Sequence, residues 1–490
     1  MKSFIFSVPV LAFFGLLSSA APLLQLAGPP LPTTAPLANE RPLLMAYYPD
    51  WASYSLPPEK IDFTRFDWID FAFGLPDKSF ALTWDDPVNA PALLQRLVTS
   101  AHDAGRYVKL SIGGWTGSQH FSAAVATEES RKEFSSTISD AYTRFSLDGI
   151  DIDWEYPGQQ GNAGNGVSPS DTSNFLLFLQ LLRRVLPQSA KITAATQTVP
   201  FAGSNGIPLQ DVSEFAKVLD WVVLMNYDVW GSSSNPGPNA PLEDGCKNSS
   251  IPSATAHSAV LAWKAAGFAS SQLVLGVPAY AYISRSTAST LRQKRTVAAS
   301  RNVRVLNDAG GFESGQVRFR DLIKQGALVR TNRVFESSSS ASGTDDGFGN
   351  SPGQEIDDSD CAGAEDDEDD VQELTFSLSP AGGLMVNPVD GDRSSAGSLV
   401  STPPPPNVFT VASFEGAGGF SRLWDVCSST PFLRSESAQQ IITFDDPQSL
   451  GLKAAWVKEA GILGVNVFDV HGDTDDWDLV DSLRRGLGII

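Results

Sequence analysis

Cysteine and histidine are scarce in this chain of 490 residues, which contains three cysteines and four histidines. The cysteines are Cys246, Cys361 and Cys427, too few and too widely spaced for a structural zinc site built from close pairs of ligands. The histidines are scattered, and the acidic residues show no calcium-loop spacing. We therefore expect neither a metal centre nor a cofactor.

Basic residues are also in short supply, with 35 Lys and Arg against 56 Asp and Glu and a formal net charge of −21. No basic stripe is present, so nucleic acid is not an expected partner. The acidic excess is concentrated, because residues 345–373 hold 13 acidic residues and no Lys or Arg. A run of this kind is typical of a solvated, low-complexity segment without a packed core.

Long hydrophobic runs are missing beyond the first residues, since no later segment has about 18 uninterrupted apolar residues, the length of a membrane-spanning helix. The chain begins with Met1-Lys2, a mostly apolar run over 4–17 and small residues over 18–21, which is the pattern of a signal peptide. We expect residues 1–21 to be removed and residues 22–41 to form a Pro-rich linker. The mature protein is then expected to be secreted, extracellular, free of the membrane and monomeric.

Short apolar runs recur along the rest of the chain and indicate β-strands. Eight of them are found, at 44–48, 68–73, 107–112, 149–154, 192–196, 221–225, 273–277 and 462–468. Helix-like stretches lie between most of these runs, at 90–104, 130–145, 173–186, 212–218, 254–266 and 450–460. Alternating strands and helices imply parallel strands, and eight such units predict an α/β fold, the (β/α)8 TIM barrel. An open doubly wound sheet is the structural alternative, and its nucleotide-binding version has little support because no Gly-rich phosphate turn follows the first strand.

The fourth apolar run carries the most informative residues of the chain, with the sequence DGIDIDWEYP from residue 148. Because side chains alternate faces along a strand, Asp151, Asp153 and Glu155 share one face and apolar residues occupy the other. Three carboxyls on one buried face cannot all ionise cheaply, so some of their pKa values rise and a shared proton is expected. Such an arrangement suits an acid catalyst.

The other candidate residues lie at the C-terminal ends of the predicted strands, where barrels of this kind place their chemistry. Aromatic side chains gather there around the carboxylates, which suits a sugar polymer because sugar faces stack on flat rings. The candidate substrate-binding residues are Tyr47, Phe73, Gly114, Trp115, Tyr156, Met225, Asp228 and Phe468.

The spacing D-x-x-D-x-D-x-E over 148–155 resembles the signature strand of glycoside hydrolase family 18, the chitinases and their relatives. Ser-x-Gly-Gly at the third strand end and Met-x-Tyr-Asp at the sixth also resemble patterns of this family, in the same order. The resemblance covers most of 42–482, except for a poorly matching insertion after residue 283. It implies a secreted endo-type chitinase that hydrolyses β-1,4-linked N-acetylglucosamine polymers, so chitin or chito-oligosaccharides are the expected partners.

The resemblance also implies a retaining, substrate-assisted mechanism, in which the substrate's own 2-acetamido oxygen attacks the anomeric carbon. Glu155 would be the general acid and then the general base. Asp153 would orient the acetamido group, and Asp151 would share a proton with Asp153. Tyr227 would hydrogen-bond the acetamido oxygen, while Asp228 would support the sugar.

One departure from the family concerns the end of the eighth strand. Family members usually carry Trp there, under the sugar at the scissile bond, whereas this chain has Phe468. The smaller ring would weaken stacking by about 0.5–1.5 kcal/mol. If the register differs by a few residues, Trp477 would take this place instead.

The insertion between the seventh and eighth strands, 283–408, begins with a helix-like segment, and in many family members a small α+β unit lines the cleft here. Its later part, 336–406, is largely low-complexity and acidic. In an exported chain one disulfide is expected, and we pair Cys246 with Cys427 because both lie in segments that resemble ordered parts of the family. The sequon Asn248-Ser249-Ser250 suits glycosylation on a surface loop.

Two other functions are compatible with the same residues. An endo-β-N-acetylglucosaminidase acting on N-glycans would use the same machinery. A non-catalytic chitin-binding lectin on the same fold is the third candidate, and Phe468 is its only support. Relatives that have lost activity typically lack the catalytic glutamate, which is present here as Glu155.

Overall fold

The computed structural model describes residues 41–286, 288–289, 291, 315–331 and 411–490, and the backbone of 374–378 and 384–388. The predicted signal peptide 1–21 and the linker up to residue 40 lie outside the described residues, as do Cys361 and most of the low-complexity segment 336–406. The two backbone segments form an antiparallel pair, β12 (Leu374–Leu378) and β13 (Leu384–Pro388). No helix in the described ranges is long and apolar enough to cross a bilayer.

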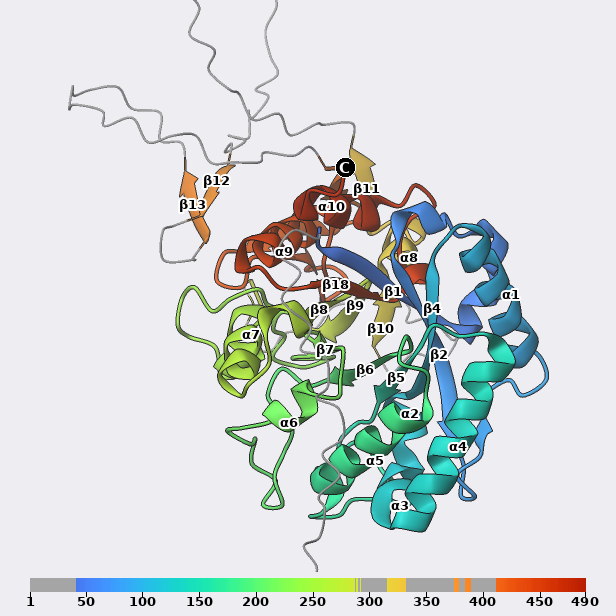
Figure 1. Cartoon of the computed structure of the whole chain (residues 1–490). Helices are drawn as coiled ribbons and strands as arrows, with labels where there is room; N and C mark the ends of the chain where they lie inside the picture. Colours follow the sequence, from blue (N-terminus) through green and yellow to red (C-terminus); the bar gives the residue numbers. More distant parts are fainter. Residues whose placement is uncertain are drawn as a thin grey trace, which may run out of the picture. The chain divides into compact units, whose positions relative to one another are not determined.

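In the described residues, eight parallel strands form a closed barrel, since β1 pairs with both β2 and β18 (Figure 1). In order around the barrel they are β1 (Leu43–Pro49), β2 (Trp68–Pro76), β4 (Tyr107–Gly113), β5 (Gly149–Asp153), β6 (Lys191–Thr196), β7 (Trp221–Met225), β8 (Leu273–Pro278) and β18 (Gly464–Phe468). Each predicted apolar run overlaps one of these strands, so the predicted TIM barrel is confirmed. A short strand, β3 (Leu82–Thr83), pairs antiparallel with the end of β2.

Helices connect the barrel strands and pack around them (Figure 1). They are α1 (Ala90–Asp103), α2 (Gly114–Gly117), α3 (Phe121–Ala126), α4 (Glu128–Phe145), α5 (Asp171–Val185), α6 (Ser213–Ala216), α7 (Ala256–Ala265), α9 (Pro447–Ala460) and α10 (Asp478–Leu487). Short 3-10 helices are η1 (Asp50–Tyr54), η2 (Pro58–Lys60), η3 (Phe63–Arg65), η4 (Ser118–His120), η5 (Pro252–Ala254), η6 (Ser270–Gln272) and η7 (Val470–Gly472). Two of the long helices start at side-chain caps: Thr127 accepts a backbone N–H of α4, and Asp446 accepts two of α9.

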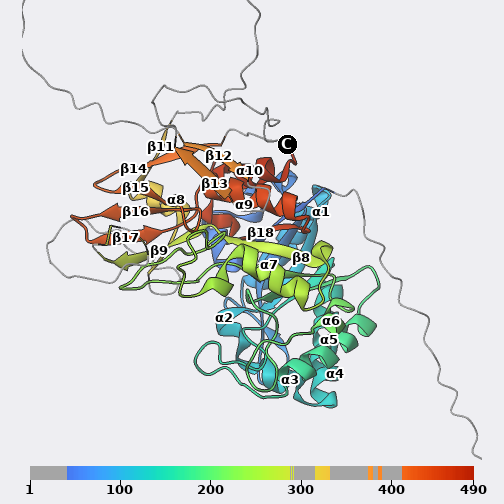
Figure 2. The same ribbon diagram turned by 90° about the vertical axis from the view of Figure 1, so that its left-hand side faces the viewer.

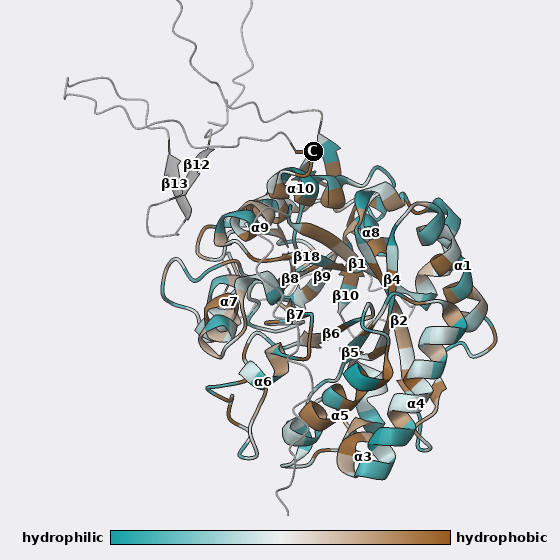
Figure 3. Cartoon of the chain, in the orientation of Figure 1, coloured by the Kyte–Doolittle hydropathy of each residue, from teal (hydrophilic) through white to brown (hydrophobic). Residues whose placement is uncertain are grey.

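Alternation along the barrel strands separates outward from inward residues. Outward residues such as Ile150 and Ile152 belong to the main core between strands and helices, and Figure 3 shows the hydrophobic character of strands such as β1 and β18. Inward residues at the N-terminal end form a separate apolar cluster of Met45, Trp68, Trp221, Val223 and Val274. Nearer the C-terminal end several inward residues are polar and fully buried, and they form the floor of the candidate site.

Between β8 and β18 the chain forms a second, antiparallel sheet (Figure 2). Its strand order is β10 (Gln316–Arg318), β9 (Tyr280–Arg285), β17 (Gln440–Thr443), β16 (Thr430–Ser435) and β15 (Ser421–Asp425). The helix α8 (Phe319–Lys324) follows β10, and β11 (Leu328–Thr331) pairs with β14 (Ser413–Gly416). The α+β unit therefore extends past both ends of the interval 283–408, because strands up to residue 443 return to pair with β9.

A disulfide joins Cys246, in the loop after β7, to Cys427, between β15 and β16, with the two Cα atoms 5.0 Å apart. This is the pairing expected from the sequence. It ties a barrel loop to the inserted sheet across a sequence separation of 181 residues. Asn248 lies exposed in the same barrel loop, where a glycan would meet solvent.

Candidate active site

The carboxylates of β5 lie at the C-terminal end of the barrel. Asp151 is fully buried, while Asp153 is 4% exposed and Glu155 is 9% exposed, so burial decreases toward the end of the strand. Trp154, on the opposite face, stacks on Phe121 with ring centroids 5.3 Å apart. The segment thus has the carboxylate face and the apolar face that its alternating sequence predicts.

Backbone contacts fix the position of Glu155. Its N–H donates to Ser118 Oγ at 2.9 Å, and Ser118 Oγ donates to the carbonyl oxygen of Gly114 at 2.9 Å. The carbonyl oxygen of Glu155 accepts from Asn165 Nδ2 at 3.0 Å. Contacts with η4 and with the loop after β5 therefore fix the backbone direction at Glu155.

Asp151 accepts hydrogen bonds from three hydroxyl groups on neighbouring strands. Its Oδ2 accepts from Tyr47 Oη at 3.0 Å and from Ser111 Oγ at 2.8 Å. Its Oδ1 accepts from Thr193 Oγ1 at 2.6 Å. All three donors stabilise the ionised form of the carboxyl. The proton shared between Asp151 and Asp153 stays a prediction.

Asp153, one step nearer the end of the strand, has a different environment. Its Oδ1 is buried and has no hydrogen-bond partner among the described residues. Burial, followed by the charges of Glu155 and Asp151, raises the pKa of Asp153 well above its usual value. The carboxylate stack therefore retains a proton more strongly at Asp153 than an exposed aspartate would.

The turn after β4 depends on two glycines. Gly113 and Gly114 have φ angles of 115° and 80°, a region that residues with a Cβ rarely adopt. A Cβ on Gly113 would lie 2.1 Å from the carbonyl oxygen of Asp153, so only glycine allows this close approach to β5. Gly114 packs on the ring of Phe73, and Trp115, the next residue, is 39% exposed.

Phe468, at the end of β18, lies among the aromatic residues of the site. Its ring centroid is 5.5 Å from that of Tyr47 and 6.1 Å from that of Tyr227. Trp477 packs elsewhere, with its ring centroid 5.7 Å from that of Phe66, immediately before α10. The structure therefore places Phe468, and not Trp477, beside Tyr47 and Tyr227.

Tyr227 and Asp228 follow β7 at the same end of the barrel, after the half-buried Met225. Burial of the hydroxyl, followed by the charge of Asp153, raises the pKa of Tyr227, so this hydroxyl stays protonated and can donate. The hydroxyl of Tyr280 donates to Asp228 Oδ1. The rings of Tyr227 and Tyr280 are 6.2 Å apart, so the two tyrosines form one wall.

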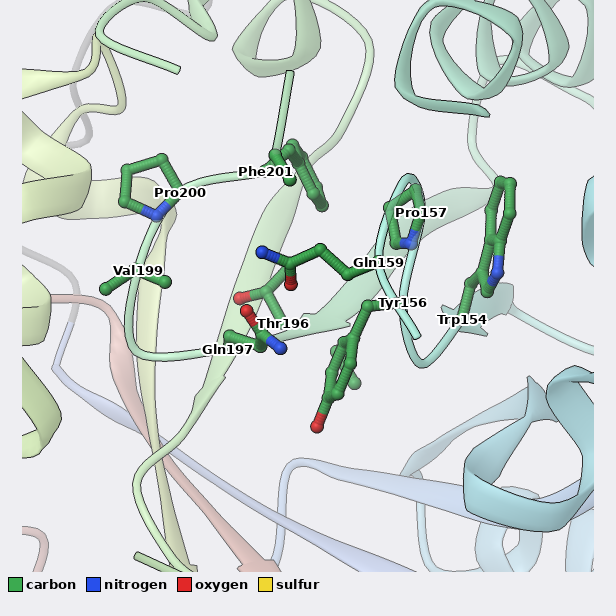
Figure 4. A pocket seen from close by; sticks show the side chains of 11 residues that line it. Trp154, Tyr156, Pro157, Gln159, Thr196, Gln197, Val199, Pro200 and Phe201 are labelled. Carbon is green, nitrogen blue, oxygen red and sulfur yellow. The ribbon is translucent and has the colours of Figure 1, made fainter. Parts of the chain in front are cut away.

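A small hollow lies beside the side chain of Tyr156, which belongs to the loop that follows β5. Its lining comes from this loop and from the loop after β6, including Gln159, Gln197 and Pro200. Figure 4 shows Tyr156, Gln159 and Gln197 around the same space. Burial and the neighbouring carboxyl of Glu155 raise the pKa of Tyr156, which keeps its hydroxyl protonated.

Sequence reasoning did not select Ser118, Thr193 or Tyr280 as site residues. The position of Tyr280, shortly after the seventh predicted strand, could have indicated a site residue, because chemistry in such barrels lies at the C-terminal strand ends. Thr193 reaches Asp151 only because β5 and β6 pair with these two residues in register, which the sequence does not reveal.

In the described ranges, no group of three or more His, Cys, Asp or Glu could hold a metal ion.

The family model of glycosyl hydrolases family 18 matches residues 43–473. The chain belongs to this family. A chitinase-like effector from Moniliophthora roreri is 33% identical over 448 residues, covering 90% of this chain and 92% of that relative. A chitinase-like effector from Moniliophthora perniciosa is 32% identical, covering 90% of this chain and 86% of that relative.

Solved structures agree with this assignment. A chitinase from Rhizomucor miehei has 26% identity and a TM-score of 0.60, covering 91% of this chain and 99% of that chain. Catalytic domain 2 of the Ostrinia furnacalis Group II chitinase, solved in complex with (NAG)5, shares the fold with 17% identity and a TM-score of 0.62. The match covers 92% of this chain and 97% of the Ostrinia furnacalis domain. The chain is therefore a family 18 protein of the chitinase type.

Proposed function

We propose that this protein is a secreted, monomeric chitinase that cuts internal β-1,4 links of N-acetylglucosamine polymers with retention of configuration. The carboxylate series of β5 carries the proposal. Asp151 has the contacts of an anion, Asp153 has a raised pKa, and Glu155 stands at the exposed end. This gradient supplies a proton donor beside a stable negative charge, which a glycosidase needs.

In the proposed first step, Glu155 donates a proton to the glycosidic oxygen while the bond from this oxygen to the anomeric carbon breaks. The acetamido oxygen of the same sugar bonds to the anomeric carbon and gives an oxazolinium ion. Asp153 accepts a hydrogen bond from the acetamido N–H. Tyr227 donates one to the acetamido oxygen, which aims that oxygen at the reacting carbon.

In the second step, water attacks the anomeric carbon from the side that the leaving sugar has vacated. Glu155, now ionised, takes a proton from this water, and the acetamido group is released with its oxygen restored. Two displacements at one carbon retain the configuration. Phe468 and Tyr47 provide an apolar surface beneath the reacting sugar, and Trp115 extends the aromatic surface toward neighbouring sugars.

Binding of chitin oligosaccharides without hydrolysis is the second candidate function. It is favoured by the relatives from Moniliophthora roreri and Moniliophthora perniciosa, which are described as chitinase-like effectors. Phe468 also favours it, since a smaller ring gives a sugar less stacking area. The presence of Glu155 together with Asp153 and Tyr227 favours the enzyme instead.

Hydrolysis of N-acetylglucosamine tetramers to hexamers by wild type and Glu155→Gln separates these functions. Release of internal fragments by wild type only supports the chitinase. Binding by both proteins without turnover by either supports the binding protein. An N-glycan with a chitobiose core belongs in the same assay, because cleavage of this substrate alone would indicate an endo-β-N-acetylglucosaminidase.

A further inference from the structure

A buried polar cluster lies inside the barrel, beneath the carboxylates that perform the proposed chemistry. It consists of Asp70 on β2, Lys109 on β4, Thr193 on β6 and Asn466 on β18. Asp70, Lys109 and Thr193 are fully buried, and Asn466 is 1% exposed. The proposed mechanism assigns no role to any of these four residues.

Lys109 is the cation at the centre of this buried polar cluster. Its Nζ lies 3.2 Å from Asp70 Oδ1 and donates to Thr193 Oγ1 at 2.8 Å. It also lies over the ring of Trp221, 4.7 Å from the centroid, which closes the cluster from below. Asp70 is held in turn by Asn466, whose Nδ2 donates to Asp70 Oδ2 at 2.8 Å.

The hydroxyl of Thr193 connects Lys109 to Asp151. A threonine hydroxyl has a single proton to donate. Because the Lys109 ammonium donates to Thr193 Oγ1, that oxygen acts as the acceptor toward Lys109, and its own proton is directed to Asp151 Oδ1 at 2.6 Å. Lys109 thus orients the Thr193 hydroxyl that donates to Asp151.

Packing alone does not require such a pair. A buried ion pair replaced by apolar side chains of similar volume is often as stable or more stable, because both charges lose their hydration when buried. Burial raises the pKa of Asp70 to about 6 despite the opposing effect of Lys109, so this environment is unfavourable to charge. Stability alone therefore does not account for the pair, and its contacts lead through Thr193 to the site.

We propose that Lys109 is a positioning residue that, through Thr193, holds Asp151 as a carboxylate and leaves the proton of the site to Asp153 and Glu155. Asp151 accepts three hydroxyl hydrogen bonds, two at Oδ2 and one at Oδ1, and each of them favours the carboxylate over the protonated acid. Asp153, whose Oδ1 has no partner in the described part of the chain, is the better acceptor of that proton.

Other titratable groups inside the barrel also influence the charge of Asp151. The titratable groups that face it are Tyr47 of β1, Asp70 of β2, Lys109 of β4, Asp153 and Glu155 from β5 and its end, and Tyr227 after β7. The facing residues on β6 and β18, Thr193 and Asn466, are neutral, and β8 contributes the apolar Val274. Lys109 is the cation of this set.

The test compares pH profiles of kcat/KM on the N-acetylglucosamine tetramer. Thr193→Val removes the hydroxyl relay and keeps the ion pair, whereas Thr193→Ser keeps the hydroxyl. The double variant Lys109→Met/Asp70→Asn removes both charges without changing the net charge. Without the relay, the Asp151 carboxylate loses the hydrogen bond that its Oδ1 accepts. The acidic limb of Thr193→Val is therefore expected about one pH unit higher, the effect of one hydrogen bond to a charged group. The double variant keeps the Thr193 hydroxyl and loses its contact with the Lys109 ammonium, so its acidic limb is expected to move in the same direction by a smaller amount.

Thr193→Ser keeps the hydroxyl and loses the methyl group, and it is expected to keep the acidic limb of the wild-type kcat/KM profile. If Thr193 acted only through the packing of its methyl group, Thr193→Ser would shift this limb as well. Lys453→Met, which breaks a buried pair outside the barrel, is the matched control and is expected to leave the limb in place. An acidic limb of Thr193→Val that coincides with that of Thr193→Ser would overturn the proposal. So would a double variant with the wild-type limb.

The activity readout rests on the proposed function, so carboxyl protonation is followed independently by infrared difference titration of the free proteins. Absence of turnover in wild type would count against the chitinase and leave this titration decisive. The expected result is a carboxyl that titrates about one pH unit higher in Thr193→Val than in Thr193→Ser. Equal titrations would overturn the role of Lys109 and Thr193.

Discussion

Two fully buried lysine–aspartate pairs lie in the described part of this chain, in two different regions. Lys109 and Asp70 face each other inside the barrel, while Lys453 of α9 pairs with Asp445 just before that helix. The contacts of Asp445 end locally, at the hydroxyl of Ser449 in the first turn of α9. The contacts of Lys109 continue through the hydroxyl of Thr193 to the carboxylate of Asp151. The same residue types therefore meet at a helix junction in one region, and in the other they contact the hydroxyl that donates to Asp151.

The largest expected effect is in the barrel interior, at Glu155. Replacement of Glu155 by Gln removes the proposed proton donor and is expected to lower kcat by about 10²–10⁴-fold. Stability should not fall, because Gln has nearly the same size as Glu and cannot carry a negative charge beside Asp153. Steady-state hydrolysis of chitin oligosaccharides and thermal unfolding measure the two quantities. A variant with more than a tenth of wild-type kcat would contradict the role of Glu155.

At the helix junction the effect should be on stability instead. Lys453→Met leaves Asp445 buried without its cation, and removal of one partner of such a pair costs about 3–5 kcal/mol. The free energy of unfolding, measured with a chemical denaturant, should fall by this amount while kcat is unchanged at a temperature where the variant is folded. The double variant Lys453→Met/Asp445→Asn is the control and should recover most of the loss. No recovery would mean that the pair itself is not the cause.

The disulfide between the loop after β7 and the inserted sheet should also act on stability. Replacing Cys246 and Cys427 by Ser together is expected to lower the free energy of unfolding by about 2–4 kcal/mol, because the unfolded chain loses a cross-link. Thermal unfolding of both proteins measures this change. Equal unfolding temperatures would show that the cross-link contributes nothing beyond the packing around it.

The smallest expected effect is again in the barrel interior. Phe468→Trp enlarges the ring beside Tyr47 and Tyr227 and should strengthen stacking on a sugar by about 0.5–1.5 kcal/mol, or roughly 2–10-fold in affinity. Calorimetric titration with N-acetylglucosamine tetramer measures this gain. Phe468→Leu, which removes the ring, should shift affinity in the opposite direction. Weaker binding by the Trp variant would indicate that the site is shaped around the smaller ring.

The sequence predicts those parts of the molecule that depend on local alternation. The carboxylate face of Asp151, Asp153 and Glu155 follows from the period of a single strand, and the eight barrel strands follow from separate apolar runs. The sequence does not decide whether Phe468 or Trp477 is the aromatic residue at the end of the eighth strand, since strand ends cannot be located from composition alone. The contacts of Trp477 with Phe66 decide between them.

Features that depend on pairing between distant strands could not be predicted. Asp70, Lys109 and Asn466 come from three strands, and each alone reads as an unusual polar residue in an apolar run. They meet because the barrel closes and brings β18 beside β1 and β1 beside β2. The extent of the inserted sheet is similar, because β17 pairs with β9 only after a long intervening segment.

The most direct test of the central claim is the anomeric form of the first products. Proton NMR of wild type acting on the N-acetylglucosamine hexamer would follow the new reducing ends before they mutarotate. Substrate-assisted cleavage with Glu155 as acid predicts β-anomers at early times, and no such signals with Glu155→Gln. Initial α-anomers would contradict the mechanism, and a bound but uncut hexamer would contradict the enzyme.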